Sequence, residues 1–151
     1  MQTDQSNVTV TFPQDVNGQG FVENLHAVPL GHDLYCVDNS PFYIYGVSLA
    51  DIVHAPINEG RPVFLKVIEH RGHSTYRVRL PTGQNHHDFT RHWKVLEQLG
   101  CSFEGSEAST RRLYSIDVPP DADILPVYKV LEDGEEAGWW AFEEAHYFDR
   151  A

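Results

Sequence analysis

The first half of the chain alternates between apolar and polar positions over short stretches. In residues 7–12, Val8 and Val10 alternate with threonines, which is the two-residue period of a half-buried strand. Later apolar stretches are separated by turn signals such as Asn58-Glu59-Gly60, and residues 62–70 are predicted to form a single strand. Many short strands joined by tight turns predict a small β-barrel or a curled antiparallel sheet.

From Ser74 the pattern switches between the periods of strands and of helices. Residues 74–80 alternate as a strand does. Four apolar residues then recur at the spacing of one helical stripe: Phe89, Trp93, Leu96 and Leu99. Gly100 follows, where a glycine often ends a helix. A second stripe follows two aspartates, Asp121 and Asp123, either of which can cap a helix: Ile124, Val127, Tyr128 and Leu131.

Short strands predicted at residues 101–107, 112–118 and 139–146 complete the second half. The resulting order is strand, helix, strand, strand, helix, strand, which is the βαββαβ pattern of a ferredoxin-like sandwich. The sequence therefore predicts an α+β protein with a strand-rich subdomain at residues 7–72 and a ferredoxin-like subdomain at residues 73–148. The helices would cover one face of the second sheet. The first subdomain would either cover the other face, giving one compact unit, or form a separate module beside it.

The chain of 151 residues carries a net charge of −11, which is unevenly distributed. Residues 1–57 contain six acidic residues and no lysine or arginine, and residues 121–151 contain nine acidic residues against two basic ones. Such a charge opposes binding to nucleic acid and to anionic membranes. We expect neither a membrane span nor a signal peptide, and a cytoplasmic location with Cys36 and Cys101 as unpaired thiols.

Recognisable catalytic and phosphate-binding motifs are absent from the sequence. Nine histidines are present, but His70 and His73 straddle a glycine, and His87 and His92 are five apart on the first helix. Neither spacing places two histidines on one face as a metal-binding pair. We therefore expect no metal, no cofactor and no enzymatic activity.

The two consecutive tryptophans, Trp139 and Trp140, are predicted to lie on a strand. Neighbouring strand residues point to opposite faces, so one would enter the helix-packed core and the other the opposite face. The second would then be buried by the first subdomain or exposed as an anchor for a partner. On the central strands, Asp117 is expected to pair with Arg77 or Arg79.

Several segments resemble a bacterial family of unknown function, domain-of-unknown-function family 4265. The resembling residues are Asp38-Asn39-Ser40-Pro41-Phe42, Gly46-Val47-Ser48-Leu49-Ala50-Asp51-Ile52-Val53, Gly72-His73-Ser74-Thr75 and Leu99-Gly100-Cys101. Arg71 stands where the family pattern has a small residue. The resemblance implies a bacterial cytosolic protein and gives no reaction.

The leading hypothesis is a non-enzymatic protein that binds a basic protein partner, more narrowly an immunity protein or antitoxin that occludes a basic toxin domain. Its contact residues would be the acidic side chains near the C-terminus and one tryptophan as an apolar anchor: Glu132, Asp133, Glu135, Glu136, Trp139, Trp140, Glu143 and Glu144.

Two alternatives stay open. One is a regulatory module that binds a small ligand between the two subdomains, near Asp38, Asp51, His73 and Ser74. The other is an enzyme that uses Asp51 or Asp38 together with His73.

Overall fold

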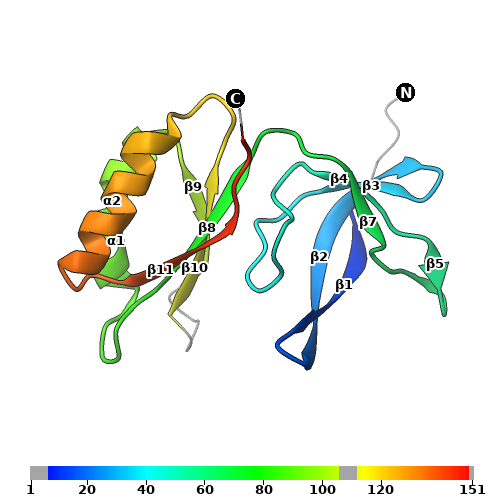
Figure 1. Cartoon of the computed structure of the whole chain (residues 1–151), viewed down its shortest axis with the longest axis horizontal. Coiled ribbons are helices and arrows are strands. Elements are labelled where there is room, and N and C mark those ends of the chain that lie inside the picture. The colour runs from blue at the N-terminus through cyan, green and yellow to red at the C-terminus, as the bar shows by residue number, and fades with distance from the viewer. Residues whose placement is uncertain (1–6, 106–111, 150–151) are drawn as a thin grey trace.

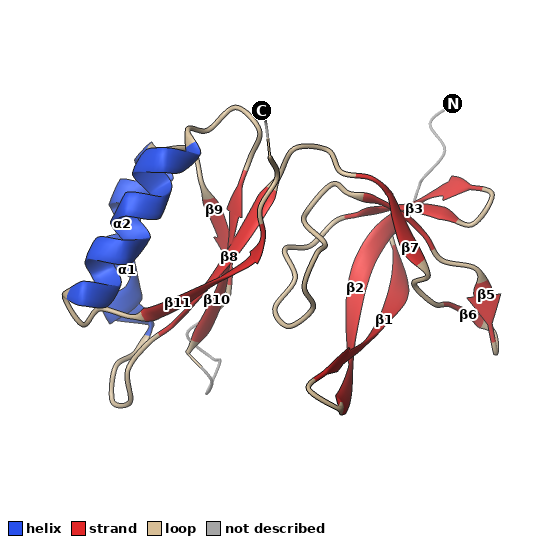
Figure 2. Ribbon diagram, viewed as in Figure 1, coloured by secondary structure: helices blue, strands red, loops and turns tan. Residues whose placement is uncertain are grey.

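The computed structural model describes residues 7–105 and 112–149. Two mostly antiparallel sheets stand side by side, and a long loop from the first half of the chain lies between them (Figure 1). Both described helices cover the outer face of the second sheet, the face turned away from the first half (Figure 2). The protein is therefore a mixed α+β structure.

The first half forms a five-stranded sheet in the order β1-β2-β3-β4-β7, with every neighbouring pair antiparallel. Its strands are β1 (Val8–Val16), β2 (Gln19–Gly31), β3 (Leu34–Val37), β4 (Ile52–His54) and β7 (Lys66–Glu69). A separate two-residue hairpin pairs β5 (Ile57–Asn58) with β6 (Arg61–Pro62).

Within the described residues this sheet is open, so of the two expected forms the small barrel is wrong. The outer edge of β1 meets the segment after β6: the N–H of Phe64 donates to the carbonyl oxygen of Thr11. Strand β7 pairs only with β4 and does not reach β1. The expected single strand at residues 62–70 is also wrong, because Val63 and Leu65 bond to the backbone of Pro56 and His54 instead of extending one ladder.

The second half forms a four-stranded antiparallel sheet in the order β11-β8-β10-β9. Its strands are β8 (Ser74–Arg79), β9 (Ser102–Glu104), β10 (Leu113–Val118) and β11 (Ala141–His146). The strand predicted at residues 101–107 is shorter than expected, and its residues 106 and 107 lie outside the described part of the chain.

The helices are α1 (His86–Gln98) and α2 (Ile124–Glu136), and local sequence signals define both. Asn85 caps α1 in a capping box with Asp88, and Asp123 caps α2. Gly100 has a φ of +100°, which confirms its role after the end of α1. Neither helix is long and apolar enough to cross a membrane.

Each half has its own cluster of buried apolar side chains. In the second half, the stripes of α1 and α2 pack on Tyr76, Val78 and Ile116 of the sheet. In the first half, Val10 and Phe12 of β1 pack with residues of the other strands and of the following loop. The connecting segments therefore join two cores.

The expectation that Trp139 and Trp140 point to opposite faces of a strand is wrong. Strand β11 begins only at Ala141, so both tryptophans belong to the turn that follows α2. Trp140 is 2% exposed and its indole N–H donates to the carbonyl oxygen of Leu131. Trp139 stacks on the ring of His92, with ring centroids 3.8 Å apart. Both pack on the helical side, with the core of the second half.

Candidate functional site

The loop at residues 38–51 lies between the two sheets and contacts both halves (Figure 1). It has no regular secondary structure, so its backbone polar groups need partners from elsewhere. The N–H of Gly46 donates to the carbonyl oxygen of Ala145 in β11, and Ser40 bonds through its hydroxyl to Ser115 of β10. The loop is thus bonded directly to the second sheet.

Glu23 of β2 fixes this loop from the first half. Its carboxylate accepts hydrogen bonds from three consecutive backbone N–H groups, those of Phe42, Tyr43 and Ile44, at 2.7 to 3.0 Å. The side chain is only 7% exposed. Three amide donors satisfy a buried carboxylate well and fix the direction of the backbone.

Arg77 of β8 fixes the same loop from the second half. Its guanidinium donates to the carbonyl oxygens of Tyr43 and Ile44, and its Nε donates to Glu143 at 3.0 Å. The side chain is 2% exposed and lies 4.6 Å from the centre of the Tyr45 ring. The expected pairing with Asp117 is therefore wrong, because the loop and β11 occupy the donors of Arg77.

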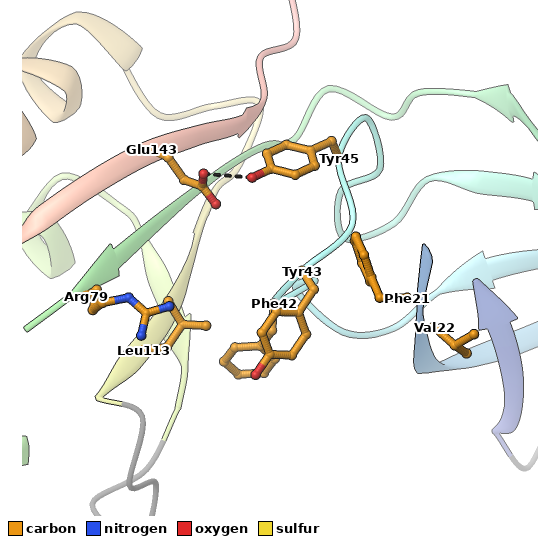
Figure 3. Close-up of a pocket in the computed structure, with 8 residues that line it drawn as sticks. All are labelled: Phe21, Val22, Phe42, Tyr43, Tyr45, Arg79, Leu113 and Glu143. Carbon is orange, nitrogen blue, oxygen red and sulfur yellow. Dashed lines mark hydrogen bonds between the residues drawn. The ribbon is translucent and has the colours of Figure 1, made fainter. Parts of the chain in front are cut away.

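We call Glu23 and Arg77, which hold the loop from two sides, the clamp. An open cleft of about 470 Å³ lies beside the clamp, between the two halves (Figure 3). Four aromatic side chains dominate its lining, together with two apolar and two charged residues: Phe21, Phe42, Tyr43, Tyr45, Val22, Leu113, Arg79 and Glu143. The figure shows Arg79 and Leu113 on the sheet of the second half, facing the rings across the cleft. Both halves therefore contribute to its walls.

The two charged residues of the cleft differ in their surroundings. Glu143 accepts from both Arg77 and the hydroxyl of Tyr45, and this second bond raises the pKa of Tyr45. Arg79 is exposed, and no ion pair joins it to a carboxylate within the described ranges. The guanidinium of Arg79 is therefore an exposed cationic part of the cleft wall.

None of the four residues expected to bind a ligand lines this cleft. Asp38 is exposed and accepts from the amide of Asn7. Ser74 accepts from the N–H of Phe148, and the carboxylate at His73 is that of Asp117, 2.8 Å from Nδ1. Asp51 and Asp38 were the expected partners of His73, but each contacts a different residue.

Asp51 belongs instead to a polar cluster where the linker between the halves meets the end of β11. Its wholly buried carboxylate accepts from the backbone of Ser48 and lies 2.8 Å from Nδ1 of His70. The ring of His70 stacks on that of His146, with centroids 4.4 Å apart. Burial, and then the neighbouring His70, lowers the pKa of His146. We call Ser48, Asp51, His70 and His146 the junction cluster.

The residues expected to bind a protein partner are spread over several environments. Trp140 is in the core, Glu144 accepts from the hydroxyl of Tyr76, and Glu143 lies at the cleft. Glu135 accepts from the backbone N–H of Phe142 and Asp133 pairs with Lys129. The acidic residues that share the outer side of α2, at the hollow that also contains Tyr128, are Glu132, Asp133, Glu135 and Glu136.

Sequence reasoning placed an alternative ligand site between the halves but assigned to it none of the residues that line the cleft, and it missed the junction cluster. The aromatic stretch from Phe42 to Tyr45 was the only local signal for the cleft, and it does not reveal the partners Arg79 and Glu143. The junction cluster joins positions 51, 70 and 146, so no local spacing could indicate it.

The architecture defines this chain as a two-sheet α+β protein whose halves share one cleft. The chain belongs to the family described as "Domain of unknown function (DUF4265)", whose family model matches residues 23–142. It is similar to a solved structure described as "Novel crystal structure of a hypothetical protein from Neisseria gonorrhoeae", with a TM-score of 0.78 and 16% sequence identity. That match covers 99% of this chain and 100% of the other, and it shows a shared fold. A comparison with curated proteins found no match.

Proposed function

We propose that this protein binds a small anionic ligand with a flat apolar body in the cleft between its two halves. The observation that carries this proposal is the combination of four aromatic side chains with the exposed cation of Arg79. A volume of about 470 Å³ lies within the range of small-molecule sites. Such sites are mostly apolar and contain a few placed polar groups that orient the ligand.

The charge of the cleft supports an anion as the ligand. The chain as a whole carries −11, yet Glu143 is engaged by Arg77 and Tyr45, while Arg79 is exposed. A guanidinium binds carboxylate or phosphate through two parallel hydrogen bonds. The rings of Phe42 and Tyr43 would contact the apolar body of the same ligand.

The clamped loop supports a preformed site. Glu23 and Arg77 fix the backbone of Phe42, Tyr43 and Ile44 from two sides. Aromatic side chains on a fixed backbone lose little conformational entropy when a ligand binds. The cleft can therefore select a ligand without first being ordered by it.

A thermal-shift screen of aromatic and aliphatic carboxylates and phosphates, followed by titration calorimetry, tests this proposal. We expect the affinity for a hit to fall at least about tenfold in Arg79→Met, the loss typical of one charge-assisted contact. Arg91→Met is the matched control, since Arg91 is an exposed arginine on α1, outside the cleft. Equal affinity in Arg79→Met and the wild type would contradict the proposal.

A second candidate function is neutralisation of a basic protein partner, as an immunity protein or antitoxin would perform it. The observation that favours it is the acidic outer side of α2, where Glu132 and Glu136 adjoin the half-exposed ring of Tyr128. Acidic rims raise the rate of association with basic partners. Trp139 is partly buried beside His92, so Tyr128 replaces it as the proposed apolar contact.

A tagged pull-down from a native host at low and high salt, together with expression of neighbouring genes, tests the second candidate. A stoichiometric partner that is toxic alone, and is released by salt and by the double change Glu132→Lys and Glu136→Lys, would support it. The control is Glu97→Lys on the exposed side of α1. A partner retained by the double variant would contradict the role of α2.

We also infer a ferredoxin-like class for the second half. The order β11-β8-β10-β9, with both described helices on one face, supports this inference. The two separate cores support subdomains at residues 7–72 and 73–148.

The proposed location is the bacterial cytoplasm, and the free thiols of Cys36 and Cys101 accord with it. The charge of −11 accords with partners other than nucleic acid or membranes.

A further inference from the structure

We propose that Asp51, His70 and His146 of the junction cluster bind a divalent transition-metal ion of the Zn²⁺ type. Each of the three side chains offers a ligand atom, and these atoms all lie within 4.8 Å of one another. The cluster lies outside the lining of the proposed ligand cleft and does not depend on it. The proposal departs from the expectation of no metal, which rested on local spacing alone.

Three separate segments bring the three side chains together. Asp51 ends the loop between the sheets, His70 lies in the linker after β7, and His146 is the last residue of β11. Nδ1 of His70 lies 2.8 Å from Oδ2 of Asp51, and the rings of His70 and His146 are stacked. Folding of both halves is therefore required to assemble the site.

The carboxylate of Asp51 is fixed as a metal ligand usually is. It is wholly buried, and it accepts from the backbone N–H groups of Ser48 at 2.9 Å and Arg71 at 3.3 Å. These donors orient the carboxylate toward the two histidines. Groups that hydrogen-bond to ligands in this way contribute to the affinity of metal sites.

His146 has a similar support. Its Nδ1 lies 2.7 Å from Oγ of Ser48. A metal-bound imidazole typically keeps a hydrogen bond on its second nitrogen. Ser48 offers that bond at Nδ1, so Nε2 of His146 can take the ion while Nδ1 remains held.

The donor set selects the class of metal. Two imidazoles with one carboxylate suit Zn²⁺, Co²⁺, Ni²⁺ or Fe²⁺, whereas Mg²⁺ and Ca²⁺ prefer oxygen ligands. The side chain of His70 is 36% exposed, which provides a route for the ion from solvent. Three protein ligands leave a tetrahedral ion with one position for water or for another ligand.

Titration calorimetry of the full, untagged chain with Zn²⁺, and visible absorption with Co²⁺, tests the proposal. We expect one ion per chain, d–d bands typical of four-coordinate Co²⁺, and no response to Mg²⁺. Both His70→Gln and His146→Gln should weaken Zn²⁺ binding at least about tenfold. The matched control is His87→Gln, an exposed histidine on α1 that should leave the affinity unchanged.

Circular dichroism separates lost binding from lost folding. Because Asp51 is buried and hydrogen-bonded, Asp51→Asn is used only if its spectrum and melting match the wild type. Saturating Zn²⁺ should raise the melting temperature of the wild type and of His87→Gln, but not of His146→Gln. Absence of Zn²⁺ binding, or equal affinity in His70→Gln, His146→Gln and the wild type, would overturn the proposal.

Discussion

Glu23 and Arg77 hold one loop from opposite halves of the protein. Glu23 accepts from the N–H groups of residues 42–44, and Arg77 donates to the carbonyl oxygens of Tyr43 and Ile44. The carboxylate of Glu23 accepts from the N–H groups of the loop, and the guanidinium of Arg77 donates to its carbonyl oxygens. The backbone polar groups at residues 42–44 of the loop thereby have hydrogen-bond partners. These bonds also fix the position of the aromatic residues that line the cleft.

Arg77→Met should destabilise the protein by about 3 kcal/mol. The change leaves buried carbonyl oxygens without donors and removes one of the two partners of Glu143, and charged hydrogen bonds of this kind have large deletion costs. Urea denaturation measures the loss. The control Arg79→Met, two residues along the same strand but exposed, should change stability by less than about 0.5 kcal/mol. A similar stability loss in both variants would contradict the claim that Arg77 holds the loop.

Glu23→Gln should release the loop locally. A neutral amide accepts more weakly than a carboxylate, so we expect a stability loss of about 1–2 kcal/mol and faster exchange of the amide protons of Phe42, Tyr43 and Ile44. Hydrogen exchange followed by NMR reads these amides one by one. Glu97→Gln, an exposed change on α1, is the control. Unchanged exchange at all three amides would show that Glu23 does not hold them.

Sequence periodicity predicted the elements whose partners are local. The stripe of Phe89, Trp93 and Leu96 and the expected cap Asp123 specify the two helices within a few residues, and the structure has both helices. The loop at residues 38–51 is specified by Glu23 and Arg77 at distant positions, and no spacing reports such bonds. The same holds for the junction cluster, which exists only once both halves have folded.

The two tryptophans show how one boundary changes a functional prediction. Alternation placed Trp139 and Trp140 on a strand, and hence one of them on the open face. The structure begins β11 two residues later than expected, after a turn, so both pack on the helical side. The boundary is fixed by Gly134, which lets the Trp140 ring approach α2 closely. A glycine inside the predicted second helix was the sequence signal that a bulky side chain packs closely against that helix.

Gly134→Ala tests this packing. Alanine normally favours a helix over glycine, but a Cβ here would lie 2.6 Å from Cε2 and Nε1 of Trp140. We therefore expect destabilisation by about 1–3 kcal/mol, the usual cost of overpacking. Glu136→Ala on the same helix should change stability by less than about 0.5 kcal/mol. A more stable Gly134→Ala protein would show that Trp140 does not lie against α2.

We expect both cysteines to react slowly with thiol reagents in the native protein. Burial raises the pKa of Cys101 to about 12 and also raises the pKa of Cys36. Since the thiolate is the nucleophile, Cys101 should react with a disulfide reagent at pH 8 only as the protein unfolds. A Cys36→Ser variant isolates its signal, and the same protein in denaturant gives the reference rate. A native rate equal to that reference would contradict the burial.

The central claim is that one small anionic ligand contacts both halves in the cleft. Backbone and methyl NMR of the labelled protein, titrated with the best hit of the screen, tests it most directly. The account predicts shifts at Leu113 and Arg79 on one side and at Phe21 and Tyr43 on the other, with the same midpoint. Shifts confined to one half, or centred on Glu132 and Glu136 of α2, would contradict it.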